Sequence, residues 1–315
     1  MAEEIIPRAQ WRQNTETKAL QLFARGAETS SWDSCRVTGA WLGLFFFAAF
    51  RKRRAIATNN VRLAFPELGE SAARQIARRS AQNFGMTACE FMHLRIASPE
   101  DVRERASIDG LEHVFECLSH GRGALLLTAH LGNWELMGAR AAQEFPLSVV
   151  ARPPSNAGIE NHIAQVRRAS GIEVISKYDT GRASLTALRQ NRTLGILPDQ
   201  HAKGPEGVVV PFFNHPARVI TSLARLAILS GAPMIPSFGV RRKPWLRDGR
   251  IVAKVSPGIY LQKPKKRDPQ AREEAVVEGT RVMVAELEKI IRAHPDQWLW
   301  MHKRWRSQDD YDNGR

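Results

Sequence analysis

The chain has 315 residues, of which 43% are hydrophobic and 25% charged, so it is long enough to bury the core of one large domain or of two smaller ones. Its formal net charge of +14 predicts a polyanionic partner, such as nucleic acid, an anionic membrane surface or a phosphorylated substrate. Three widely spaced cysteines exclude a disulfide framework, and the lack of a linker, repeat or low-complexity tract favours a single main domain.

The first hydrophobic segment, residues 37–50, is followed directly by the basic cluster Arg51, Lys52, Arg53 and Arg54. The segment has about fourteen residues, whereas a bilayer span needs about twenty. An apolar, aromatic-rich segment beside a basic cluster is typical of a membrane surface. After a polar stretch over residues 1–31, we therefore expect a monotopic or shallowly inserted helix, with a buried core helix as the alternative. The positive-inside rule places the main domain in the cytoplasm.

The rest of the chain predicts an α/β fold. Amphipathic helices are expected over residues 71–92 and 272–293. Between them, short apolar strands alternate with helices. The strands are expected at residues 123–130, 147–151, 172–176, 194–197, 208–212 and 234–240, and the helices at residues 159–169, 182–191 and 222–230. This alternation indicates a mostly parallel central sheet covered by helices on both faces.

An imidazole and a carboxylate lie five positions apart in residues 130–135 (HLGNWE), directly after the apolar run 124–129. The strand predicted there brings His130 to its carboxyl end, where open α/β sheets bind ligands. On one continuous helix the two side chains would point about 140° apart, so they meet only if His130 precedes a helix and Glu135 lies in its first turn. Glu135 would then hold one ring nitrogen while the other faces a substrate hydroxyl. A structural His–Glu pair is the alternative.

Five motifs in consistent order resemble the late acyltransferases of lipid A biosynthesis, the lauroyl/myristoyl acyltransferases of the lysophospholipid acyltransferase-like superfamily. They are residues 130–135 (HLGNWE), 152–153 (RP), 197–200 (LPDQ), 210–213 (VPFF) and 294–305 (HPDQWLWMHKRW). The likeness runs from about Arg51 to Arg306, and residues 59–66 (NNVRLAFP) resemble the segment after the family's membrane anchor. The chain departs from the family at its amino terminus, where members usually begin with a longer apolar anchor.

The resemblance implies an acyltransferase of class EC 2.3.1 that moves a fatty acyl chain from an acyl-carrier-protein or coenzyme A thioester to a hydroxyl of a lipid A precursor. It implies no cofactor beyond that donor. The implied partners are acyl carrier protein, a phosphorylated glycolipid acceptor and the anionic cytoplasmic face of the inner membrane. We expect a polar amino terminus with the membrane-associated segment over residues 1–60, a catalytic domain over residues 61–306 and a disordered tail over residues 307–315.

The functional residues of the family fall on four positions of this chain. Its His-x4-acid motif falls on His130 and Glu135, and its further Arg and Asp fall by spacing on Arg167 and Asp199, with Arg168 as the adjacent alternative. A neutral imidazole suits removal of a hydroxyl proton, and Glu135 would fix its tautomer. Arg167 would stabilise the developing oxyanion or hold a phosphate of the acceptor. A salt bridge between Arg167 and Asp199 is the structural alternative.

Two further regions carry expectations. The basic residues Lys203, Arg218 and the run 241–243 are candidates for contacts to acceptor phosphates, but a solvated charged face is the better explanation for any single one of them, and none is assigned as a binding residue. Trp298, Trp300 and Trp305 fit either an interfacial belt or packing that seals the sheet edge, and packing is the expectation for Trp298 and Trp300.

Other functions have less support in the sequence. The same chemistry on a different glycolipid or on an aminolipid is the main alternative, because the His-x4-acid motif specifies acyl transfer and not the acceptor. A zinc site is not predicted, since the two-histidine spacing of metalloproteases is absent. Nucleic-acid binding is not predicted either, because no helix-turn-helix, zinc-finger or RNA-binding aromatic motif accompanies the positive charge.

Overall fold

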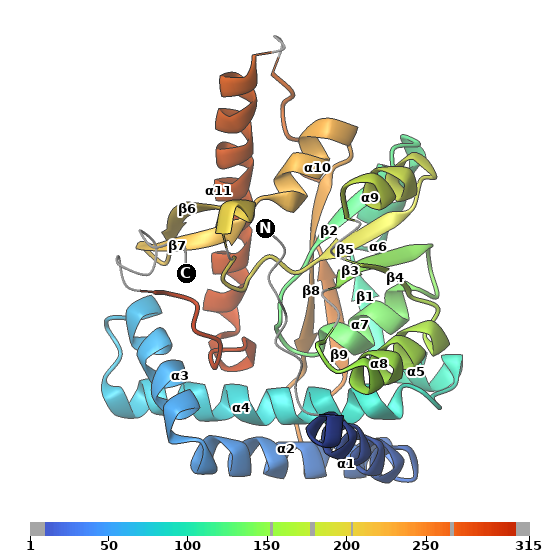
Figure 1. The fold of residues 1–315 in the computed structure, drawn as a ribbon, viewed down its shortest axis with the longest axis vertical. Helices are drawn as coiled ribbons and strands as arrows, with labels where there is room; N and C mark the ends of the chain where they lie inside the picture. Colours follow the sequence, from blue (N-terminus) through green and yellow to red (C-terminus); the bar gives the residue numbers. More distant parts are fainter. Residues whose placement is uncertain (1–9, 152–153, 177–179, 203, 265–267, 307–315) are drawn as a thin grey trace.

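The computed structural model describes residues 10–151, 154–176, 180–202, 204–264 and 268–306. The motif at 152–153, Lys203 and the tail predicted to be disordered lie outside these residues. Figure 1 shows a central sheet with α11 standing beside it and α4 running along the base of the molecule, where α1 and α2 lie against it.

The bounds of the elements are as follows. The helices are α1 (Gln10–Glu28), α2 (Trp32–Ala49), α3 (Arg51–Ala64), α4 (Glu70–His93), α5 (Pro99–Arg105), α6 (Leu111–Ser119), α7 (Trp134–Ala141), α8 (Ala157–Ala169), α9 (Thr180–Arg189), α10 (Ser222–Ser230) and α11 (Pro269–Ala293), with short 3-10 turns η2 (Gly204–Glu206) and η3 (Pro295–Gln297). The strands are β1 (Ala106–Asp109), β2 (Ala124–Leu127), β3 (Leu147–Ala151), β4 (Glu173–Ser176), β5 (Thr193–Ile196), β6 (Gly207–Phe212), β7 (His215–Ile220), β8 (Met234–Arg241) and β9 (Ile251–Val255).

The central sheet has the strand order β1-β9-β8-β2-β5-β3-β4. All neighbouring strands pair in parallel except β8 and β9. Successive side chains of a strand point to opposite faces. On β2, Leu125 and Leu127 pack in the cluster that includes α9, α10 and α11, whereas Ala124 and Leu126 pack with α6 and α7. The mostly parallel sheet with helices on both faces is therefore confirmed.

The sheet differs from the expectation in its edges. The strand predicted at residues 208–212 is β6, which pairs with β7 in a separate antiparallel hairpin rather than in the central sheet. Pro211 and Pro216 face each other in this hairpin, and proline cannot donate to a ladder, which suits a two-stranded ribbon and not a sheet interior. Strands β1, β7 and β9 were not predicted, because they are short or carry polar residues that interrupt the apolar run.

Helix α2 packs closely on α4 through glycines and leaves one apolar face open. A Cβ added to Gly39 would lie 2.4 Å from the carbonyl oxygen of Gly85, so the two backbones are nearly in contact. The opposite face exposes Val37, Trp41 and Phe45, with Trp41 and Phe45 68% and 69% exposed. In the part of the chain that the structure describes, no helix is long and apolar enough to cross a membrane. The membrane-associated helix remains a prediction.

The contact between α2 and α4 predicts an effect on stability. Gly39→Ala is expected to lower the free energy of unfolding by about 1–3 kcal/mol, because the new methyl group forces the two backbones apart. Gly26→Ala in α1 is the matched control: nothing lies within 4 Å of its added Cβ, so that variant should be as stable as the wild type or slightly more stable. Denaturant unfolding of both variants measures the difference, and equal midpoints would contradict the close packing.

Helix α1 lies within the stretch that the sequence indicated only as polar. It contacts both α4 and α8. Asn156, which caps the amino terminus of α8, accepts a hydrogen bond from Thr17 (3.0 Å) and donates one to the carbonyl oxygen of Gln13 (2.9 Å). At its other end, Glu28 pairs with Arg95. Helix α1 thus supports α8, the helix that carries Arg167.

Candidate active site

His130 and Asp199 meet at the carboxyl edge of the central sheet. Strands β2 and β5 are parallel neighbours, with Leu127 paired to Ile196, so the loops that follow them leave the sheet side by side. Nδ1 of His130 lies 2.9 Å from Oδ1 of Asp199, and the backbone N–H of His130 donates to Oδ2 at 3.0 Å. The register of the two strands therefore builds this pair.

The carboxylate of Asp199 is almost fully buried, at 1% exposure, and accepts a third hydrogen bond from Nε1 of Trp298 (2.8 Å). Burial by itself raises the pKa of Asp199, but the charge of His130 and the hydrogen bonds from His130 and Trp298 outweigh it, so the pKa is lowered. For His130, burial lowers the pKa, and the neighbouring Asp199 carboxylate more than compensates, so the pKa is raised. Asp199 is thus a fixed anion beside the imidazole.

The hydrogen bonds of His130 define its tautomer. Because a carboxylate only accepts, the Nδ1 proton points at Asp199, and Nε2 carries the lone pair in the neutral ring. Among the described residues, Nε2 of His130 has no hydrogen-bond partner. The side-chain amide nitrogen of Gln200 lies 3.4 Å from the other ring nitrogen, Nδ1. The His130 side chain is partly exposed. Its Nε2 is therefore free to accept a proton from a substrate.

Glu135 lies in the first turn of α7 and pairs with Arg167 of α8. Nη2 of Arg167 donates to Oε1 of Glu135 at 2.7 Å and Nε donates to Oε2 at 3.3 Å. Nε1 of Trp134 donates to the same carboxylate at 3.1 Å, and the Trp134 ring meets the His130 ring edge to face, with centroids 5.0 Å apart. Burial lowers the pKa of Arg167, but the charge of Glu135 outweighs it, so the pKa is raised.

The structure changes how the four predicted residues are paired. The carboxylate that holds Nδ1 of His130 is Asp199, whereas we expected Glu135, and the alternative salt bridge between Arg167 and Asp199 is replaced by one between Arg167 and Glu135. The physical reason is that the loop after β5 brings Asp199 to Nδ1 of His130, while the guanidinium group of Arg167 on α8 binds the carboxylate of Glu135. Arg168, the alternative to Arg167, is exposed.

The turn between His130 and Glu135 requires glycine. Gly132 has φ +59°, and a Cβ there would lie 1.7 Å from the carbonyl oxygen of Gly239. Its N–H donates to the carbonyl oxygen of Gln297 (3.1 Å), and its own carbonyl oxygen accepts from Asn83 and Thr87 (2.8 Å each). The next residue, Asn133, donates its N–H to the carbonyl oxygen of Gly239 on β8 (3.0 Å), so the turn is bonded to α4, η3 and β8 at once.

A buried ion pair lies beneath this turn. Arg241, with a fully buried side chain, donates from Nη1 and Nη2 to the two carboxylate oxygens of Glu90 (2.8 and 2.6 Å) and from Nε to Asn83 (2.9 Å). Glu90 also accepts from Asn133, the residue that caps α7 (2.7 Å). Arg241 is therefore not available to an acceptor phosphate, which corrects the expectation for that residue. Of the other candidates, Arg218 donates to the carbonyl oxygen of Gly204 (2.9 Å).

These residues differ in how visible they are in the sequence. Trp298 and Trp300 are buried, which confirms their predicted packing, but the bond from Trp298 to Asp199 was missed, because nothing in the pattern distinguishes a packed indole from a donating one. Glu90 has a signal: it lies on the apolar face of the helix predicted over residues 71–92, and a carboxylate is seldom buried without a partner.

A cavity of about 620 Å³ opens beside the Glu135–Arg167 pair, between α8 and the ends of β3 and β4. Arg167 and Arg168 line it together with the apolar side chains of Ala151, Ile163 and Ile172. Of the four predicted site residues, Arg167 alone is among the described residues that line this cavity. Over the described ranges, no group of three or more His, Cys, Asp and Glu side chains is arranged to hold a metal ion.

His130 and the acid that holds it thus lie at the edge of a mostly parallel sheet, and a half-apolar cavity with arginines opens beside the Glu135–Arg167 pair. Comparison with known families gives the reaction class. The model of the family described as "Bacterial lipid A biosynthesis acyltransferase" matches residues 31–307, so the chain belongs to this family and is an acyltransferase.

Individual relatives are similar over most of the chain, with low identity. The lipid A biosynthesis lauroyltransferase of Escherichia coli K12 is 26% identical over 274 residues, 86% of this chain and 85% of that protein. The palmitoleoyltransferase of lipid A biosynthesis from the same strain is 22% identical over 270 residues, covering 85% and 84%. A phosphatidylinositol mannoside acyltransferase of Mycobacterium tuberculosis H37Rv is 25% identical over 203 residues, covering 63% and 59%. Helix α1 precedes the region that the family model matches.

Proposed function

We propose that this protein transfers a fatty acyl chain from an acyl-carrier-protein or coenzyme A thioester to a hydroxyl of a lipid A precursor, with His130 as the general base and Asp199 as the residue that orients it. The observation that carries this proposal is the contact between Nδ1 of His130 and the buried carboxylate of Asp199, which leaves Nε2 without a partner among the described residues. The family match and the names of the relatives support the reaction class.

The chemistry follows from this geometry. As the acceptor hydroxyl attacks the thioester carbon, its proton passes to Nε2 of His130, and the imidazolium is stabilised by Asp199. When the tetrahedral intermediate collapses, the carbon–sulfur bond breaks and the same proton passes to the leaving thiolate. His130 returns to its neutral form, so one residue serves as base and then as acid.

Glu135 and Arg167 are proposed to position substrate next to this base. Arg167 uses Nε and Nη2 for Glu135, and no partner of its Nη1 occurs in the part of the chain that the structure describes. Nη1 is thus available to an oxyanion or to a phosphate oxygen of the acceptor. The cavity beyond it is lined by Arg167 and Arg168, by two acids, Glu160 and Glu173, and by apolar walls. Its arginines suit the phosphate of a substrate, and its apolar walls suit the hydrocarbon part.

We propose that the enzyme works at the cytoplasmic face of the inner membrane, resting on the exposed face of α2. Trp41 and Phe45 on that face are large and apolar, and Arg51 and Lys52 follow the helix directly and are exposed. Together they favour an anionic lipid surface. The same positive charge would attract an acidic carrier protein as acyl donor.

A different glycolipid acceptor is the second candidate. It is favoured by the likeness to phosphatidylinositol mannoside acyltransferases, one of which is 28% identical to this chain over 138 residues. The His130–Asp199 pair acts on a hydroxyl and does not select the molecule that carries it.

A radiolabelled transfer assay tests the proposal. The full chain in detergent is offered acyl-carrier-protein and acyl-coenzyme A thioesters of several chain lengths, with either a tetra-acylated, Kdo-bearing lipid A precursor or a phosphatidylinositol mannoside as acceptor. We expect labelled product with the lipid A precursor and the preferred donor. Product with the mannoside alone would overturn the lipid A acceptor and retain acyl transfer, and no product with either acceptor would overturn both.

A further inference from the structure

A second cavity, apart from the candidate active site, lies where α2 turns into α3. It has a volume of about 450 Å³ and is lined by Leu44, Phe47 and Ala48 of α2, Arg54 of α3, and Arg74 and Arg78 of α4. We call it the elbow cleft. It shares no lining residue with the cavity beside Arg167. In Figure 1 the turn between α2 and α3 lies at the lower edge of the molecule, away from the sheet.

The elbow cleft is strongly positive. Its arginines are not neutralised by acids: no carboxylate lies within 4.0 Å of the guanidinium groups of Arg54, Arg74 or Arg78 among the residues whose placement is described. Arg54 is held in place, because its Nη1 donates to the carbonyl oxygens of Phe47 (3.2 Å) and Ala48 (2.7 Å) at the end of α2. Arg74 and Arg78 lie one turn apart on α4, and both are exposed. Three like charges that converge on one cleft favour an anion between them.

The other half of the lining is apolar and continues into the exposed face of α2. Ala48 is exposed and lies three residues after Phe45, and Leu44 lies three residues after Trp41, so each is a neighbour of those aromatic residues on the helix surface. The cleft thus places an anion-binding group directly beside a surface that suits hydrocarbon. An inorganic anion makes no use of the apolar part, whereas a phospholipid uses both.

We propose that the elbow cleft binds the phosphate of an anionic phospholipid from the membrane, and thereby fixes the apolar face of α2 on the bilayer. The guanidinium groups of Arg54, Arg74 and Arg78 contact the phosphate oxygens, and Leu44, Phe47 and Ala48 contact the glycerol and the first methylenes of the chains. The site is independent of the acyl-transfer chemistry at His130.

Vesicle binding by the full chain tests this proposal. The probes are vesicles of phosphatidylcholine alone and of phosphatidylcholine with phosphatidylglycerol. The variant is Arg74→Gln with Arg78→Gln, and the matched control is Arg189→Gln with Arg272→Gln, which removes the same charge from exposed positions on α9 and α11. We expect the first pair to weaken binding to the anionic vesicles about 10- to 30-fold and the control pair to change it less than about 2-fold, since a basic side chain contributes mainly when it lies at the surface of the bilayer.

The result also separates specific from general attraction. Equal losses of vesicle binding in the two double variants, or no loss in the first, would overturn the proposal that the elbow cleft binds a phospholipid. Tight binding of inorganic phosphate to the wild type, lost in the first variant, would overturn the lipid as occupant. Acyl transfer in detergent should be unchanged in the first variant, which shows that it is folded, and vesicle binding is measured whether or not the acyl-transfer proposal holds.

Discussion

Asp199→Asn is expected to lower the rate of acyl transfer by about 10²- to 10⁴-fold with the fold intact. Two donors, the backbone N–H of His130 and the indole N–H of Trp298, point at Oδ2 of Asp199. In the variant the amide oxygen is the acceptor that satisfies both, so the amide NH₂ faces Nδ1 of His130. Nδ1 must then accept, the ring proton moves to Nε2, and the imidazole cannot serve as a base.

The pH dependence of kcat/KM gives a second readout of the same substitution. His130 acts as a base only when neutral, and its pKa is raised because Asp199 outweighs the opposing effect of burial. Wild-type activity should therefore fall as the pH drops below this raised pKa. Removal of the Asp199 charge lowers the pKa, so the acid limb of the residual activity should move to lower pH. In Glu135→Gln, which leaves the Nδ1 hydrogen bond in place, the limb should move less. A larger effect in Glu135→Gln than in Asp199→Asn would identify Glu135 as the orienting acid.

The second large effect is expected at Arg241, where substitution should destabilise the whole domain. Arg241→Met leaves the carboxylate of Glu90 buried without its cation, and losing one partner of a buried pair costs about 3–5 kcal/mol of unfolding free energy. Denaturant unfolding measures this loss.

The neighbouring Arg242 provides the control. Its guanidinium is half exposed and lies 3.5 Å from Asp248, so Arg242→Met should cost about 0–1 kcal/mol. The double variant Arg241→Met with Glu90→Leu should recover part of the loss, because no buried charge remains, although the Asn133 amide is then unpaired. If Arg241→Met costs no more than Arg242→Met, the buried pair does not hold the turn at Gly132.

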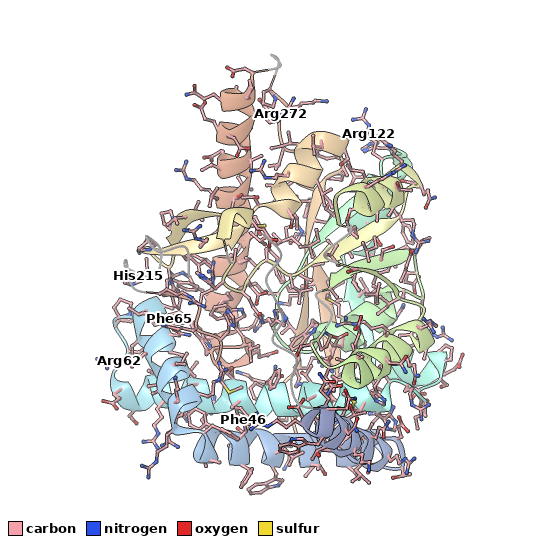
Figure 2. All side chains as sticks on the ribbon, in the orientation of Figure 1. Phe46, Arg62, Phe65, Arg122, His215 and Arg272 are labelled. Atoms are coloured by element: carbon pink, nitrogen blue, oxygen red, sulfur yellow. The ribbon has the colours of Figure 1, made fainter. Side chains whose placement is uncertain are left out.

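The fold was predictable wherever a run of apolar residues indicates a buried strand. Strands β2, β3, β4, β5 and β8 were expected from such runs, and the alternation with helices gave their parallel direction. Strand β9 was missed because Lys254 interrupts its run. Its antiparallel direction follows from the short, helix-free connection from β8, and this connection cannot be recognised before β9 itself is known. These patterns do not determine how the side chains pack between the sheet and the helices, which Figure 2 shows.

The pairing of the site residues could not be predicted from the sequence. His130 and Asp199 were both placed by the resemblance, but their pairing depends on β2 and β5 being neighbours, which is a fact of topology and not of spacing along the chain. The sequence offers two acids for one histidine, and Glu135 is nearer along the chain. Glu135 is instead satisfied by Arg167 from α8, because the Gly132 turn starts α7 with this carboxylate facing that helix.

The most direct test of the central claim is the single-turnover rate of acyl transfer by the wild type, by His130→Gln and by His120→Gln. His120 is an exposed histidine at the end of α6, hydrogen-bonded to Tyr260 (2.9 Å) and remote from Asp199 in the fold, so its variant controls for loss of any histidine. We predict a loss of about 10²- to 10⁴-fold in His130→Gln and an unchanged rate in His120→Gln. A His130→Gln protein that transfers the acyl chain at the wild-type rate would contradict the role of His130 as the base.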